Sequence, residues 1–237
     1  MRNKYLDCID FDRVNALLEG FNQTTGFVTA ILDLEGQILS KSGWRQICTE
    51  FHRVNSETAA NCKISDTELS RKTEENEKYH FYKCINGLID VAVPIIIEGE
   101  HVANLFSGQF FFEEPDIPYY KEQAQRYGFD EAAYLQALKD VPVVSKEKVE
   151  ETMNFLLSIT QMIAELTFDK FEKIELNEAR KKSEAALLES EAFTRAVMDN
   201  LPIGLAVNSV VPNIVFTYAN DNFLKFYHVD RESLKDP

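Results

Sequence analysis

The N-terminal third of the chain alternates between helical and extended patterns of apolar residues. Apolar positions recur on one helical face over residues 14–21, and Asp10 is placed to cap that helix. Residues 26–40 contain two β-prone runs around the turn-forming sequence DLEG, which predicts a hairpin. Residues 44–54 return to a helical stripe, and the polar stretch over residues 55–78 predicts a mostly exposed helix.

The middle of the chain has the most hydrophobic pattern. Residues 79–84 predict a strand, and residues 90–98 and 101–112 predict a hairpin whose turn contains Gly99. Glycine suits such a turn because it adopts a positive φ without steric cost. Both arms are nearly continuous in apolar residues, so we expect strands that are covered on both faces or lie centrally in their sheet.

After this hairpin the pattern becomes helical. Residues 115–127 and 130–139 predict two short helices, and Ser145 is placed to cap a longer one. Neither glycine nor proline occurs between Ser145 and Leu201, so this helix is predicted to continue for many turns. From Phe171 its polarity rises, and a seven-residue apolar frame, broken at its centre, predicts a signalling linker that joins two copies of the chain. A solvated single helix is the alternative.

The C-terminal tail has a third character. Residues 203–208 and 214–219 predict two strands, and residues 220–227 predict a short helix. So few elements cannot bury a full hydrophobic core. We therefore interpret residues 196–237 as the first part of a second, incomplete domain.

Composition narrows the possible partners. The 237 residues carry 25 Lys and Arg against 39 Asp and Glu, a formal net charge of −14 at pH 7. This charge opposes binding to nucleic acid or to anionic lipid, so neither is expected as a partner. The charged start of the chain does not resemble a secretion signal, and no apolar run approaches the length needed to span a membrane. We therefore expect a cytoplasmic location.

The sequence contains none of the common nucleotide-binding, hydrolase or metalloprotease motifs. Its four histidines are scattered along the chain, with no recognisable arrangement for acyl transfer. We therefore predict a binding protein rather than an enzyme.

The cysteines form the first candidate site. Cys48 and His52 share one helix face because they are four residues apart, and Cys62 and Cys84 would complete a set of four ligands for zinc or an iron–sulfur cluster. The alternative is that these cysteines are small buried apolar residues, which is common for free cysteine. Thiols that line a cavity would also contact a ligand directly.

The second candidate site is a polar insertion in the apolar hairpin. Gly108 and Gln109 interrupt the run between Phe106 and Phe110. Glycine within a strand often marks the close approach of backbone or of a ligand, and a buried glutamine needs hydrogen-bond partners that a small polar ligand would supply. The alternative is that Gln109 faces solvent or bonds to a neighbouring main chain. The aromatic residues of this region would either line a pocket or form an ordinary core.

Several of these segments together resemble the PocR sensory domain, over roughly residues 5–165. The segments are Cys48-x3-His52, residues 61–66 (NCKISD), residues 82–90 (YKCINGLID), residues 93–95 (VPI), Gly99 and residues 107–110 (SGQF). The resemblance implies a variant of the PAS-like sensor fold that binds simple hydrocarbon derivatives and has no catalytic activity.

The tail, residues 191–237, resembles the start of a PAS domain, in which the segment beginning Asn220-Asp221-Asn222-Phe223 follows the second strand. A PocR-like domain, a helical linker and a PAS domain in series resemble the input half of a sensor histidine kinase. The regulator that gives the family its name ends instead in a DNA-binding domain, which favours a kinase as the output here.

The sequence therefore predicts an α+β protein with a PAS/GAF-like antiparallel sheet flanked by helices. Residues 1–165 are the predicted ligand-binding sensory domain, residues 166–195 the signalling linker, and residues 196–237 the start of the PAS domain. The predicted ligand-binding residues are Trp44, Cys48, Phe51, Cys62, Cys84, Phe106, Gln109 and Phe110. The alternatives are a redox or metal sensor that uses Cys48, His52, Cys62 and Cys84, and a scaffold that only dimerises.

Overall fold

The structure is a computed structural model that describes residues 3–72, 79–209, 215–232 and 234. The chain divides into two compact units, Met1–Glu172 and Lys173–Pro237. The division of the chain into three functional parts remains a prediction.

The first unit is built on one antiparallel five-stranded sheet in the order β2-β1-β5-β4-β3. The strands are β1 (Val28–Asp33), β2 (Ile38–Ser42), β3 (His80–Lys83), β4 (Ile89–Ile97) and β5 (Glu100–Phe110). Both predicted hairpins are present, and β1, β5 and β4 occupy the centre of the sheet. The turn between β4 and β5 places Glu98 and Gly99 at φ 49° and 77°, as a primed turn requires.

The helices begin close to their predicted caps. The backbone N–H of Arg13 donates to Asp10 at the start of α1, and that of Lys148 donates to Ser145 at the start of α5. The helical elements of this unit are η1 (Leu6–Cys8), α1 (Phe11–Thr25), the π-helical turn η2 (Ile47–His52), α2 (Ser56–Lys72), α3 (Ile117–Tyr127), α4 (Glu131–Lys139) and the first part of α5 (Lys146–Asn200). The predicted helix over residues 55–78 is therefore present to Lys72, and residues 73–78 lie outside the described residues.

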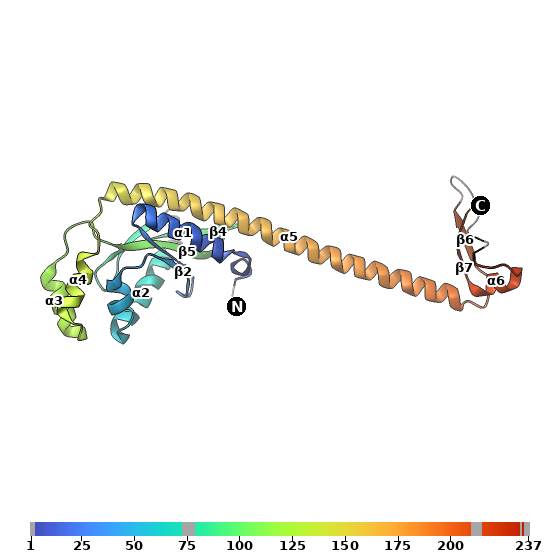
Figure 1. The fold of residues 1–237 in the computed structure, drawn as a ribbon, viewed down its shortest axis with the longest axis horizontal. Helices are drawn as coiled ribbons and strands as arrows, with labels where there is room; N and C mark the ends of the chain where they lie inside the picture. The colour runs from blue at the N-terminus through green and yellow to red at the C-terminus, as the bar shows by residue number, and fades with distance from the viewer. Residues whose placement is uncertain (1–2, 73–78, 210–214, 233, 235–237) are drawn as a thin grey trace. The chain divides into compact units, whose positions relative to one another are not determined.

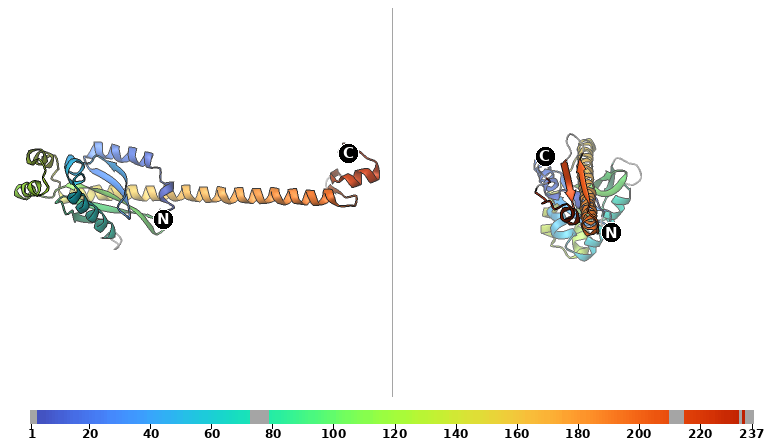
Figure 2. Two further views of the ribbon diagram at one scale, coloured as in Figure 1. Left: turned by 90° about the horizontal axis from the view of Figure 1, so that it is seen from below. Right: turned by 90° about the vertical axis from the view of Figure 1, so that its right-hand side faces the viewer.

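The two faces of the sheet carry different elements. Helices α1 and α5 lie side by side over one face (Figures 1 and 2), where apolar residues of both helices pack against Ile31, Val93 and Leu105. The opposite face is covered by η2 and α2, and α3 and α4 extend beyond it. The main hydrophobic core thus lies beneath α5, while the second face meets a more polar layer.

A β-bulge near the end of β5 changes which way its side chains point. Asp90 of β4 pairs with Gly108, but the preceding Ile89 pairs with Phe110, so Gln109 is an extra residue in β5. Gln109 has φ 59°, a left-handed conformation that few residues other than glycine adopt. The extra residue reverses the alternation of the strand, and Phe110 joins the core on the α1 and α5 face.

The second unit contains the rest of α5, an antiparallel pair β6 (Ala206–Ser209) and β7 (Val215–Ala219), and α6 (Asp221–Tyr227). Asn220 is fully buried and organises the turn between β7 and α6. Its side-chain oxygen accepts from the backbone N–H groups of Leu205 and Phe223, and its amide donates to two carbonyls before β6. Both predicted strands and the predicted helix are present, and residues 210–214 lie outside the described residues.

Within the part of the chain that the structure describes, we find no helix with the length and apolar character that a membrane crossing demands.

Candidate ligand-binding cavity

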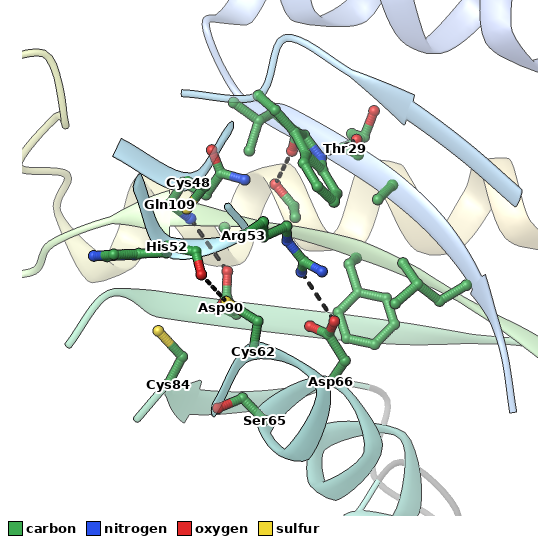
Figure 3. Close-up of a pocket in the computed structure, with 17 residues that line it drawn as sticks. Thr29, Cys48, His52, Arg53, Cys62, Ser65, Asp66, Cys84, Asp90 and Gln109 are labelled. Atoms are coloured by element: carbon green, nitrogen blue, oxygen red, sulfur yellow. Dashed lines mark hydrogen bonds and ion pairs between the residues drawn. The ribbon is translucent and has the colours of Figure 1, made fainter. Parts of the chain in front are cut away.

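A small cavity lies between the second face of the sheet and the elements η2 and α2. Its volume is about 40 Å³. Six of the predicted ligand-binding residues line it, and Figure 3 shows them with their neighbours: Trp44, Cys48, Cys62, Cys84, Phe106 and Gln109. The fold therefore brings together side chains from four separate segments of the chain.

Two predicted lining residues are placed elsewhere. Phe110 is only 1% exposed and packs against Phe27 beneath α5, because the bulge at Gln109 turns it to the opposite face. Phe51 points from η2 toward the α4 side, where its ring centroid lies 5.1 Å from that of Tyr134. The prediction that these two residues form walls of the cavity was wrong, and both belong to hydrophobic cores.

Asp90 is the principal polar group of the cavity. Its carboxyl accepts a hydrogen bond from the backbone N–H of Gln109, at 3.3 Å. Burial raises the pKa of Asp90 to about 7, the nearby Asp66 carboxylate adds to this rise, and the bond from Gln109 opposes it. The carboxyl therefore holds its proton to a higher pH than an exposed aspartate does.

Gly108 makes room for this carboxyl. A Cβ atom at Gly108 would lie 2.0 Å from Oδ1 of Asp90 and 2.9 Å from its Cα atom. The glycine inside this strand therefore does mark a close approach, but the approaching groups are the carboxyl and the Cα atom of Asp90 on the neighbouring strand and not a ligand.

An ion pair forms the neighbouring wall. The Arg53 guanidinium lies 2.9 Å from Oδ2 of Asp66 and stacks over the Trp44 ring, with 4.6 Å between its central carbon and the ring centroid. Trp44 is held in turn by a hydrogen bond from its indole N–H to the Thr29 carbonyl. Burial raises the pKa of Asp66 and Arg53 opposes that rise. The charge of Arg53 is thus already matched by one carboxylate.

The three thiols of the cavity are free and buried. Burial raises the pKa of Cys62 to about 11 and those of Cys48 and Cys84 well above their usual value. Burial thus favours the protonated form of all three thiols, whereas the thiolate is the reactive form.

His52 is committed to a different partner. Its ring Nε2 lies 2.7 Å from the Tyr134 hydroxyl, and burial, followed by the charge of Arg53, lowers its pKa to about 4. Among the described residues, no group of three or more His, Cys, Asp or Glu side chains is placed to hold a metal ion. The metal-sensor alternative based on Cys48, His52, Cys62 and Cys84 therefore has no support from the structure.

A buried hydrogen-bond network supports the cavity from behind. The Tyr134 hydroxyl bonds to Gln123, whose amide donates to the Asn86 carbonyl. The Asn86 side chain, fully buried, donates to the Thr58 carbonyl and to the sulfur of Cys62. Because this network connects η2, α2, α3 and α4, it fixes the elements that carry the cavity walls.

Sequence reasoning missed Asp90, Arg53, Asp66 and the partners of His52. Asp90 gave one usable signal, since it is a lone carboxylate at the start of the apolar run of β4. Nothing in the spacing of Asn86 indicates that its side chain would be buried.

Comparison with known proteins agrees with this architecture and defines the class as a sensory domain. Residues 7–168 match the family described as the sensory domain found in PocR, and the chain belongs to this family. It is also similar to the regulatory protein PocR of Salmonella typhimurium (strain LT2), with 22% identity over 102 residues. That similarity covers 43% of this chain and 33% of the other protein, so the chain matches about a third of its relative's length. The protein is therefore a sensory input module.

Proposed function

We propose that this domain senses a small organic molecule held in the cavity and transmits a conformational bias into α5. The main support is the position of Gln109. Its side chain lines the cavity, and it lies two residues before Phe111, whose main chain bonds to the segment that leads into α5. Family membership supports a sensory role, and the cavity supplies a place for the ligand.

The size of the cavity limits the ligand. A cavity of about 40 Å³ accommodates only a few non-hydrogen atoms, since one water molecule needs at least about 10–15 Å³ on the same scale. Larger organic ligands occupy pockets of roughly 300–1,000 Å³. Short alcohols, diols and similarly compact compounds are therefore the proposed ligands.

The first step of the transmission is the connection between β5 and η2. The side-chain oxygen of Gln109 accepts a hydrogen bond from the backbone N–H of Arg45, at 2.6 Å. The backbone N–H of Gln109 donates to Asp90. A ligand that moves Asp90 therefore acts on the bulge. The bulge is in turn bonded to the segment that leads into η2, the element that carries Cys48 and is followed by Arg53.

The second step leads from the bulge to α5. The N–H of Phe111 donates to the Pro142 carbonyl at 2.9 Å, and the N–H of Val144 donates to the Phe111 carbonyl at 2.8 Å. Ser145, the next residue, caps α5. A shift of the bulge thus reaches the start of α5 through two main-chain hydrogen bonds. Its size is limited by the difference in ligand affinity between the two states.

We further propose that α5 serves as a linker to a PAS domain in a sensor kinase, with residues 196–237 forming the beginning of that domain. The arrangement around Asn220 supports this, because its side chain bonds to the N–H of Phe223 as part of the Asn-x-x-Phe segment. Pairing of two chains through α5 is the proposed assembly. It is supported by large apolar side chains that the linker part of α5 leaves exposed, including Ile174 at 41% and Leu188 at 66%.

The assembly is tested by size-exclusion chromatography with light scattering, which measures the molar mass of the protein in solution. We expect a dimer for the unmodified chain and for the control Gln161→Glu, whose site on α5 is also exposed. The combined change Ile174→Glu and Leu188→Glu is expected to give a monomer. A dimer that persists in this variant would show that α5 does not hold the two chains together.

Ligand binding is tested by thermal unfolding with a panel of short alcohols, diols and small acids. A compound present at about 100 times its Kd stabilises the folded state by about 2.7 kcal/mol. For a unit of this size we expect a rise in Tm of roughly 5–10 °C. If no compound of the panel raises the Tm, the proposed class of ligand is wrong.

A further inference from the structure

We infer that Asp90 is the ligand anchor of this cavity, and that the ligand presents an O–H or N–H donor to it and carries no negative charge. The inference rests on the proposed function and names the chemistry of the ligand for the same site. Asp90 is assigned this role from its position, its remaining hydrogen-bonding capacity and the charges around it.

The position of Asp90 is built into the sheet. Asp90 pairs with Gly108 across β4 and β5, and the space that a Cβ atom of Gly108 would fill is occupied by Oδ1 of Asp90. The extra residue Gln109 then directs its backbone N–H toward the same carboxyl. Two unusual backbone features, a glycine within a central strand and a left-handed glutamine, therefore serve to hold one carboxyl beside the cavity.

The hydrogen bonds of Asp90 leave it able to accept more. A carboxylate has about four acceptor sites on its two oxygens. The hydrogen bond that holds it comes from the N–H of Gln109, at a long 3.3 Å. A ligand hydroxyl or ammonium would supply a stronger donor.

The charge balance of the cavity excludes an anion. Arg53, the cation that lines it, is bound to Asp66 at 2.9 Å and stacked on Trp44. None of the ion pairs between described residues includes Asp90. An anionic ligand would thus meet a carboxyl group with no cation left to offset the repulsion, whereas a neutral or cationic donor would not.

Three two-carbon compounds separate these cases. Ethylene glycol, ethanolamine and glycolate share one hydroxyl group and nearly the same size. Their second group is a neutral hydroxyl, a cationic ammonium and an anionic carboxylate, respectively. Calorimetry and thermal unfolding of the 237-residue chain at one pH and ionic strength therefore compare ligands that differ mainly in the charge and donor capacity of this second group.

For the unmodified chain we expect ethylene glycol and ethanolamine to bind, and glycolate to bind at least tenfold more weakly. In Asp90→Asn the amide oxygen still accepts a hydrogen bond but the charge is gone. We therefore expect ethanolamine to lose at least tenfold in affinity and ethylene glycol to change only a few-fold. The matched control is Asp169→Asn, which makes the same chemical change at an exposed position of α5 and should leave all three affinities unchanged.

The outcomes separate this inference from the proposed function. If glycolate binds as tightly as ethylene glycol, or if Asp90→Asn retains its affinity for ethanolamine, Asp90 is not the anchor and the cavity remains a ligand site. If none of the three compounds binds and another compound of the panel does, the same Asp90→Asn comparison with that compound decides the role of Asp90. If nothing binds, both proposals fail. The comparison of three compounds on the unmodified chain holds even if Asp90→Asn does not fold.

Discussion

Gly108 and Asp90 face each other on neighbouring strands so closely that a Cβ atom on the glycine would lie 2.0 Å from the Asp90 carboxyl oxygen. Such a distance requires a shift of the aspartate or of the backbone, because its Cα atom would also be only 2.9 Å away. The identity of residue 108 thus determines the position of the carboxyl that we assign to ligand binding.

The first prediction follows directly. Gly108→Ala is expected to lower the free energy of unfolding by about 1–3 kcal/mol, the usual cost of overpacking, and to abolish ligand binding because Asp90 is displaced. Gly20→Ala is the control, since a Cβ atom there meets nothing within 4 Å and alanine favours the helix. Urea unfolding of both variants measures the difference. Equal stabilities would contradict the close approach.

The second prediction concerns pH. The pKa of Asp90 is about 7 in the folded chain and near 3.9 in an unfolded one. Between about pH 3.9 and 7 Asp90 is therefore protonated in the folded state and ionised in the unfolded state. The stabilisation by this proton is fully present below the unfolded pKa and is lost as pH rises through 7. From pH 5.5 to 7, the unfolding free energy of the native chain should therefore fall relative to Asp90→Asn, by at most about 1.4 kcal/mol per unit.

Urea unfolding at several pH values between 5.5 and 8 tests this. The difference between the two proteins should change up to about pH 7 and level off above it. Asp169→Asn should show no such trend relative to the native chain. A difference that is constant with pH would mean that Asp90 is ionised throughout.

The third prediction concerns the network behind the cavity. Tyr134→Phe removes a buried hydroxyl and leaves His52 and Gln123 without that partner, which should cost about 1–3 kcal/mol. Tyr119→Phe makes the same change on a half-exposed ring whose hydroxyl bond is long, 3.4 Å, and should stay within about 0.5 kcal/mol of the native value. If the two variants are equally stable, the network does not support the fold.

The fourth prediction concerns the link between the bulge and η2. Glycine at position 109 tolerates the positive φ but lacks the side chain that bonds to Arg45. Gln109→Gly is therefore expected to remain folded and to bind ligand, while the ligand no longer alters hydrogen exchange at Thr49, whose N–H bonds to the Arg45 carbonyl. Exchange at Phe111 and Val144 should still respond, because the main chain of the bulge carries that step. An unchanged response at Thr49 in Gln109→Gly would exclude the side chain of Gln109 from the link to η2.

The sequence was sufficient for the strands and helices but not for the details of the cavity. Hairpins, caps and helix lengths follow from local periodicity. In a regular strand Phe106 and Phe110, four residues apart, would share a face. One extra residue at Gln109 reverses that alternation, and no pattern in a single strand reveals a bulge that depends on its pairing with β4.

The same limit applies to partners that lie far apart in the chain. Cys48, Cys62 and Cys84 were correctly predicted to lie near one cavity, whereas the bond between His52 and Tyr134 joins residues 82 positions apart. That bond removes His52 from the metal set that its spacing from Cys48 had indicated. Periodicity and spacing describe one element at a time, so they did not find Asp90 as the central polar group.

The most direct test of the account is a crystal structure of the chain grown with saturating ethylene glycol. We predict density for the diol in the cavity, with one hydroxyl within hydrogen-bonding distance of the Asp90 carboxyl and close to the bulge at Gln109. A structure with the diol bound only outside the cavity, and with the thiols and Trp44 packed around an unchanged hollow, would contradict the proposed function.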